Sequence, residues 1–110
     1  MYSKEYLKNL EIIRNKVDAR TLLESLAEEA SELSQAALKL IRAKGLSGNP
    51  TPISDEEAEA ELLIEIADVR NCINAFGLPS KYGGLINEIT EAKMKRWVER
   101  LESVENEKES

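Results

Sequence analysis

Thr21 to Gly45 reads TLLESLAEEASELSQAALKLIRAKG, and this stretch decides the fold. Leucine and alanine recur every three or four residues, which is the spacing that places side chains on one face of an α-helix. The helix is expected to begin between Asp18 and Thr21, where a side-chain oxygen can accept backbone N–H groups, and Thr21 and Glu24 have the spacing of a capping box. Gly45 is a natural end. The stretch therefore predicts one long amphipathic helix.

The same periodicity predicts three further helices, over about residues 3–17, 54–76 and 85–101. Ser3 and Ser54 are the expected N-caps. Glycine and proline mark the connections, at residues 45–54, at Gly77-Leu78-Pro79 and at Gly83-Gly84. No stretch alternates apolar and polar residues in the manner of a strand.

The fold expected from this pattern is all-α, an antiparallel helical bundle of about four helices. The second and third helices are expected to form its central hairpin. Residues 1–102 are expected to be a single domain, followed by a polar, frayed tail over residues 103–110. The helices carry more Leu, Ile and Ala than a short hairpin can cover, so assembly through the hairpin into a homo-oligomer is expected.

Composition excludes several classes of function. With 21 acidic and 15 basic residues the net charge is −6, which argues against non-specific binding to nucleic acid or anionic membrane. No stretch approaches the length of a membrane span, and the N-terminus lacks the apolar core of a signal peptide, so a cytoplasmic protein is expected. The lack of histidine excludes Ser-His-Asp and Cys-His hydrolysis, and the single Cys72 excludes an intramolecular disulfide.

Two acidic pairs interrupt the apolar faces of the second and third predicted helices, Glu29 with Glu32 and Glu65 with Asp68. Residues three apart are neighbours on a helix, so each pair points two carboxylates the same way. If the two helices pack together, four carboxylates meet in a partly buried pocket, and such a pocket needs a cation. Acidic pairs at this spacing also occur elsewhere, so their placement among apolar neighbours is what is specific. The alternative is a solvated edge of two amphipathic helices.

A metal at these carboxylates has to be held by oxygen, because the chain has no histidine. Carboxylate oxygens are the ligands of magnesium, manganese and calcium. The sequence therefore predicts a site for a hard divalent cation, if the two helices converge.

The segments EEASEL (residues 28–33) and EIADV (residues 65–69) together resemble the signature of the MazG-like, all-α nucleotide pyrophosphohydrolases, a superfamily that includes the dimeric dUTPases. KMKRW (residues 93–97) resembles the basic segment that often follows on a later helix of that family. The resemblance covers roughly residues 20 to 100. The two halves of the signature are farther apart than is usual in the family, and the surplus falls in the loop at residues 45–54.

This resemblance implies metal-dependent hydrolysis of a nucleoside triphosphate (NTP or dNTP) to the monophosphate and pyrophosphate. It implies Mg²⁺, with Mn²⁺ as a further possibility, held by Glu29, Glu32, Glu65 and Asp68. Glu28 and Glu32 are the catalytic candidates. Glu28 would orient or deprotonate the water or hold a further metal, and its alternative role is that of a surface glutamate.

Four further residues are candidates for substrate binding. Lys93 and Arg96 would bind the β- and γ-phosphates, unless they belong to a solvated helix face. Asn71 could reach sugar or base edges, unless it is an ordinary helix-surface residue. Trp97 could stack on a base, although packing in a core or between subunits explains it as well.

The resemblance also implies a dimer or tetramer with active sites near the subunit interfaces. A different class of function remains open: a non-catalytic interaction or regulatory module whose acidic face docks a basic partner. A third possibility is a protein with the family fold that binds metal and hydrolyses nothing.

Overall fold

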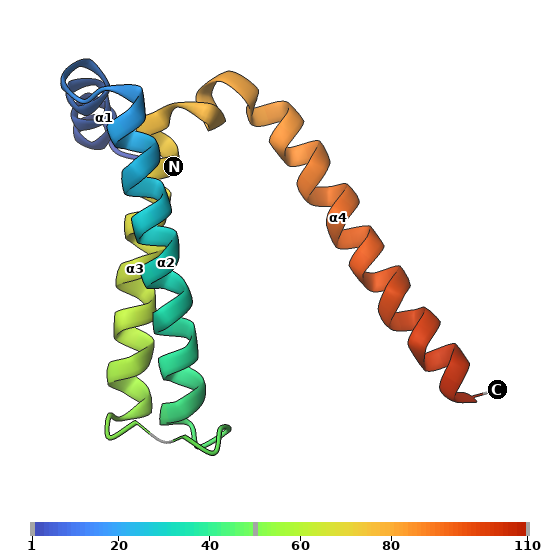
Figure 1. The fold of residues 1–110 in the computed structure, drawn as a ribbon. Helices are drawn as coiled ribbons and strands as arrows, with labels where there is room; N and C mark the ends of the chain where they lie inside the picture. The colour runs from blue at the N-terminus through green and yellow to red at the C-terminus, as the bar shows by residue number, and fades with distance from the viewer. Residues whose placement is uncertain (1, 50, 110) are drawn as a thin grey trace. The chain divides into compact units, whose positions relative to one another are not determined.

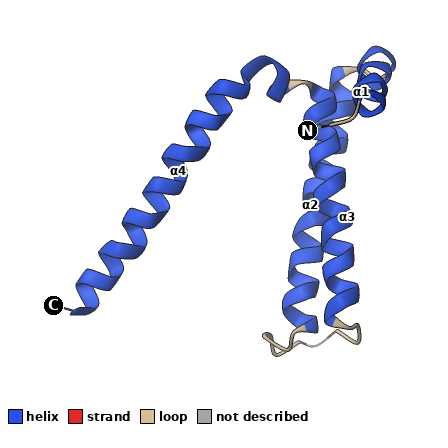
Figure 2. Ribbon diagram, turned by 180° about the vertical axis from the view of Figure 1, so that it is seen from behind, coloured by secondary structure: helices blue, strands red, loops and turns tan. Residues whose placement is uncertain are grey.

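The computed structural model describes residues 2–49 and 51–109. Figure 2 shows helices joined by loops and turns, and the described residues contain no strand. The all-α prediction is confirmed. The described residues form four helices, α1 (Lys4–Lys16), α2 (Ala19–Ala43), α3 (Asp55–Phe76) and α4 (Leu78–Glu109).

The chain divides into two compact units, Met1–Gly77 with α1 to α3 and Leu78–Ser110 with α4. The expectation that residues 1–102 form a single domain stays a prediction. No described helix is long and apolar enough to cross a membrane.

Helices α1, α2 and α3 begin at polar caps. The Ser3 and Ser54 hydroxyls accept the backbone N–H groups of Tyr6 and Glu57, at 3.1 Å in each case, as predicted. α2 begins within the predicted range, with Asp18 and not Thr21 as the cap, and Oδ1 of Asp18 accepts the Thr21 N–H at 2.7 Å. The hydrogen bonds from Thr21 favour the ionised carboxylate of Asp18 and lower its pKa from 3.8.

The central feature of the first unit is the hairpin of α2 and α3, which lie side by side in Figures 1 and 2. Lys44, just after α2, pairs with Asp55 (3.7 Å) and Glu59 (3.3 Å) at the start of α3. Lys39, which precedes Lys44 on α2, pairs at 2.9 Å with Glu61, which follows Glu59 on α3. Because earlier residues of α2 meet later residues of α3, the two helices are antiparallel, and the predicted hairpin is confirmed.

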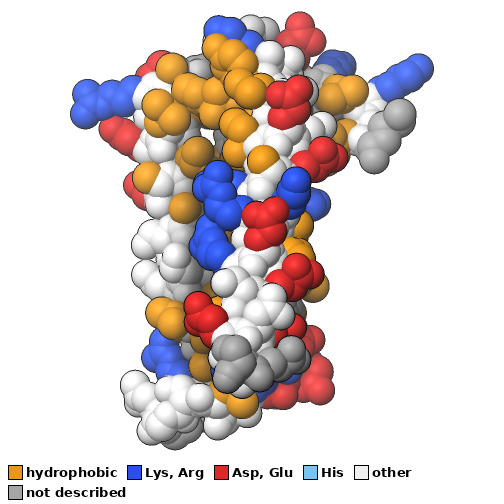
Figure 3. All heavy atoms as spheres, turned by 90° about the vertical axis from the view of Figure 1, so that its right-hand side faces the viewer, with side chains coloured by type: hydrophobic (Ala, Val, Ile, Leu, Met, Phe, Trp, Pro, Cys, Tyr) orange, Lys and Arg blue, Asp and Glu red, His pale blue; other side chains and the backbone are white. Residues whose placement is uncertain are grey.

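The first unit has few buried side chains. Among the described residues the buried apolar side chains are those of Leu10, Ala36, Ala58 and Ala75, and no large side chain is fully buried. Alanine at the helix contacts allows a close approach but removes little apolar surface from water. Many large apolar side chains of the hairpin are exposed instead. Figure 3 shows one face of the molecule, on which hydrophobic side chains are interspersed with acidic and basic ones.

α1 packs against α3 through a polar network at one end of the hairpin. The Tyr6 hydroxyl donates to Oδ1 of Asn71 at 2.7 Å and accepts from Nδ2 of Asn74 at 3.1 Å. Arg14 Nη2 donates to the Asn74 carbonyl oxygen at 2.6 Å, near the end of α3. A guanidinium at a helix C-terminus is favoured by the helix dipole, so this contact holds α1 in place on α3.

α4 differs from the prediction at both of its ends. It begins at Leu78, directly after the left-handed Gly77 (φ 91°) that caps α3, and not near residue 85. Pro79 is tolerated because the first turn of a helix does not need its N–H, and the expected break survives only as non-helical backbone at Tyr82. The helix continues to Glu109, where a frayed tail was predicted from residue 103. Residues 103–109 contain no glycine or proline, and glutamate and lysine are good helix formers.

Candidate metal centre

Three of the predicted carboxylates converge between α2 and α3. Glu29 of α2 and Glu65 and Asp68 of α3 each offer one oxygen, and these oxygens lie within 4.8 Å of one another. All three side chains are partly buried. We call Glu29, Glu65 and Asp68 the carboxylate triad. The prediction that the acidic side chains of these two helices converge is confirmed for three of the four carboxylates, without Glu32.

The triad lies on a continuous stripe along the hairpin. On α2 the stripe residues are Ser25, Glu29, Glu32, Ala36 and Lys39. On α3 they are Glu61, Glu65, Asp68, Cys72 and Ala75. Both stripes advance by four and then three residues, the spacing that keeps side chains on one face of a helix facing its partner. The sequence places carboxylates where a helical hairpin would ordinarily place leucine.

Two oxygens of the triad lack any partner. Oε2 of Glu29 and Oε2 of Glu65 are buried from solvent, and neither accepts a hydrogen bond from a described residue. A buried carboxylate oxygen without a donor is costly, and either a proton or a cation would satisfy it. Two such oxygens on facing helices distinguish this centre from a solvated acidic edge.

Glu29 and Glu65 hold their protons more tightly than an ordinary glutamate does. Burial raises the pKa of Glu29 from 4.5 to about 7, helped by a hydrogen bond with Glu32 and by the negative charges of Glu32, Asp68 and Glu65. Burial also raises the pKa of Glu65, together with the charges of Glu32 and Asp68. The thiol pKa of Cys72, one turn from Asp68, is raised by burial and by the charges of Glu29 and Asp68. Among the described residues, no positive charge contributes to these shifts or balances the carboxylates in the centre.

The donor set fits a hard divalent cation. Every donor of the triad is a carboxylate oxygen, which Mg²⁺ and Mn²⁺ accept as ligands, and the partnerless oxygens of Glu29 and Glu65 are free to coordinate. Glu32 is exposed and is not part of the triad, although its charge acts on both glutamates. Its predicted role as a ligand stays a prediction. The carboxylates whose oxygens lie close enough together to share a cation are those of Glu29, Glu65 and Asp68.

Two cavities adjoin the triad along the stripe. The first, of about 600 Å³, lies between α1, α2 and α3 and is lined mainly by uncharged residues, among them Tyr6, Ser25, Asn71 and Cys72. The second, of about 400 Å³, lies on the other side of the triad, where Glu32, Lys39, Glu61 and Glu65 contribute to its lining. One side of the centre is thus free of charge, and the other carries charges of both signs.

The remaining predicted residues fall in different places. Glu28 is exposed on α2 and directly precedes Glu29 in the sequence. Asn71 lines the uncharged cavity, and its Oδ1 accepts the Tyr6 hydroxyl hydrogen. Lys93, Arg96 and Trp97 are exposed on α4, in the second unit, and their roles in substrate binding stay predictions.

Sequence reasoning missed Tyr6 and Lys39 as residues that line the cavities. Lys39 could have been found, because it follows Glu32 by seven residues and therefore shares its helix face. Tyr6 gave no such signal, since its place beside Asn71 depends on how α1 packs on α3.

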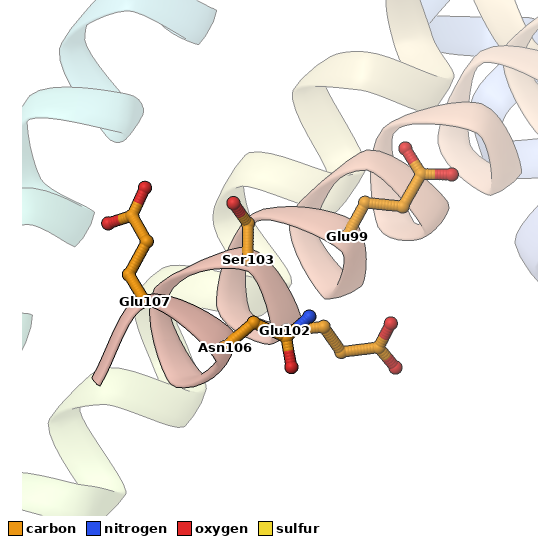
Figure 4. Close-up of a pocket in the computed structure, with 5 residues that line it drawn as sticks. All are labelled: Glu99, Glu102, Ser103, Asn106 and Glu107. Atoms are coloured by element: carbon orange, nitrogen blue, oxygen red, sulfur yellow. The ribbon is translucent and has the colours of Figure 1, made fainter. Parts of the chain in front are cut away.

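A further hollow of about 400 Å³ lies along α4, lined by Glu99, Glu102, Ser103, Asn106 and Glu107. Figure 4 shows that these side chains come from one helix and point in different directions. They do not converge on a common point, so this hollow does not have the geometry of a catalytic site.

Comparison of the chain with protein-family models, curated proteins and solved structures gives no match. Membership of the MazG-like superfamily therefore stays the prediction made from residues 28–33 and 65–69.

Proposed function

We propose that this protein is a metal-dependent nucleotide pyrophosphohydrolase of the MazG-like kind. It would hydrolyse a nucleoside triphosphate to the monophosphate and pyrophosphate. The observation that carries the proposal is the pair of buried, partnerless oxygens of Glu29 and Glu65, on the two helices whose motifs resemble that family. A single cation bound to both oxygens would use residues of both motifs.

The cation's contribution is positive charge, which attracts an anionic triphosphate to an acidic site and polarises water and phosphate oxygens. Glu29, Glu65 and Asp68 would hold the cation. The charge of Glu32 acts on Glu65, so Glu32 would also attract the cation. A triphosphate alone would be repelled by these carboxylates. Substrate binding is therefore expected to depend on the metal.

The chain's own residues account for the rest of the site. The cavity between α1, α2 and α3 has no charged lining residue, which suits a nucleoside and not a phosphate. Asn71 lies there with its side-chain oxygen engaged by Tyr6, so the amide group remains to donate to a base or sugar oxygen. Glu28, exposed on α2 directly before Glu29, is the candidate that would orient or deprotonate the attacking water.

We also propose that the protein assembles into a homo-oligomer. Exposed apolar side chains on the hairpin include Leu38, Ile41, Leu63 and Ile64, and none of the described large side chains is fully buried. Apolar surface of this extent favours burial against another copy. Dimer and tetramer are separated by analytical ultracentrifugation, and a monomer at working concentration would contradict the proposal.

The decisive test is a screen of canonical and modified NTPs and dNTPs with Mg²⁺ and with Mn²⁺, with pyrophosphate and phosphate measured separately. Asp68→Asn should abolish pyrophosphate release while circular dichroism stays unchanged. Glu24→Gln is the matched control, because Glu24 pairs only locally with Arg20 on the same helix as Glu29. Full activity of Asp68→Asn would refute the proposal. A protein without Mg²⁺ binding or turnover would instead be the interaction module.

A further inference from the structure

The cavity beside Glu32 contains a lysine that the proposed function has not yet used. Lys39 is the basic residue in the lining of this cavity, which also includes Glu65 of the triad and Glu32. Its Nζ lies 2.9 Å from Oε2 of Glu61, on the opposite helix. The side chains of Lys39 and Glu61 are 38% and 44% exposed, so the ammonium group remains open to solvent and to a ligand in the cavity.

Lys39 lies on the stripe that also carries Glu29 and Glu32, seven residues after Glu32 on α2. Long side chains on a helix lean toward its N-terminus and cover the preceding turn. For Lys39 that turn carries Gln35 and Ala36, which line the same cavity and follow Glu32. The ammonium group is therefore the positive charge that a ligand meets as it extends from the triad along this side of the hairpin.

The cavity on the α1 side of the triad has no charged residue in its lining. The larger cavity on the α1 side is lined by neutral residues such as Tyr6, Asn9 and Asn71. A molecule that is neutral at one end and carries a chain of phosphates at the other matches this asymmetry. Its neutral end suits the α1 side, and its terminal phosphates suit the Lys39 side.

We propose that Lys39 binds the terminal phosphates of the substrate and that Glu61 holds the lysine in place until the substrate arrives. This inference rests on the proposed function and assigns a direction to the triphosphate along the hairpin. Lysine binds phosphate as a point charge, and exchange of one carboxylate for a phosphate needs no rearrangement of the helices.

The contrasting view is that Lys39 and Glu61 merely tie α2 to α3. Lys44 provides the matched control for this view. Its side chain is also 38% exposed, and it also bridges the two helices, through Asp55 and Glu59. Lys44 does not line the cavity beside the triad. A purely structural role would make the two lysines equivalent.

The test compares Lys39→Gln with Lys44→Gln by calorimetric titration of inorganic tripolyphosphate in the presence of Mg²⁺. Lys39→Gln should weaken binding by about tenfold, the effect of one charge-assisted contact, and Lys44→Gln should change it by less than about twofold. The same loss should appear as a higher KM for the hydrolysed triphosphate. Affinity for the nucleoside monophosphate should not change, because it has no terminal phosphates.

Glu61→Gln separates phosphate binding from a structural ion pair. It frees the ammonium group and removes a negative charge, so tripolyphosphate should bind as tightly as to the wild type, or more tightly. A tenfold loss in Glu61→Gln would overturn the assignment, and so would equal affinities in Lys39→Gln and Lys44→Gln while the wild type hydrolyses triphosphates. A wild type that neither binds tripolyphosphate nor hydrolyses any triphosphate would overturn the proposed function together with this inference.

Discussion

Binding of Mg²⁺ to the carboxylate triad should release a proton, and the amount should depend on pH in a predictable way. Glu29 has a pKa raised to about 7 because it is buried beside Glu32, Asp68 and Glu65. Below that pH its carboxyl group is mostly protonated in the metal-free protein. A cation needs the ionised form, so it has to displace the proton.

The magnitude follows from the pKa of Glu29. With a pKa near 7, about one proton is released per Mg²⁺ at pH 6 and about half a proton at pH 7. The apparent affinity for Mg²⁺ should therefore rise by about tenfold between pH 6 and pH 8 and then level off. The raised pKa of Glu65 acts in the same direction.

Isothermal titration calorimetry with Mg²⁺ in buffers of different ionisation enthalpy measures both the affinity and the number of protons released. Glu29→Gln should lose most of the pH dependence and bind Mg²⁺ more weakly. Glu24→Gln, on the same helix but paired with Arg20, should behave as the wild type. A pH-independent affinity with no buffer-dependent heat in the wild type would refute a buried carboxylate centre that binds the metal.

Three further outcomes are expected. The metal-free protein should lose thermal stability as the pH rises from 4.5 to about 7, because Glu29 is ionised in the unfolded chain but still protonated in the folded chain. A melting temperature that rises over this range would contradict the raised pKa of Glu29. Glu29→Gln should melt higher than the wild type without metal at pH 7.5, whereas its Mg²⁺-dependent hydrolysis should fall by at least about 100-fold; wild-type turnover would exclude Glu29 as a ligand. Tyr6→Phe, which removes the 2.7 Å hydrogen bond to Asn71, should lower the free energy of unfolding by about 0.5–1.5 kcal/mol in urea denaturation, and an unchanged value would mean that α1 is held by other contacts.

Local sequence signals were sufficient for most of the helix positions. Ser3 and Ser54 cap helices where predicted, and Gly77 ends α3 with the left-handed backbone that glycine adopts at low cost. The helix predicted over residues 85–101 is present within α4, but its start was predicted too late because Pro79 and the Gly83-Gly84 pair were read as breaks. Proline is compatible with a helix's first turn, and the backbone interruption falls at Tyr82 instead.

The candidate site could be predicted in part. Glu29, Glu65 and Asp68 were found because carboxylates interrupting an apolar helix face are costly without a cation. Glu32 has the same spacing and was grouped with them, yet its side chain is exposed. Its burial depends on how closely the facing helix approaches at that level, and periodicity does not contain that information.

By itself the sequence determined that the chain is helical, where most of its helices begin and end, and which carboxylates share a helix face. These properties depend on neighbours within about one turn, through caps, backbone preferences and side-chain spacing. Only the tertiary structure decided that oxygens of Glu29 and Glu65 are buried without partners, that Tyr6 reaches Asn71, and that Lys39 faces Glu61. Those properties depend on the register and distance between helices, which arise from packing between residues far apart in the chain.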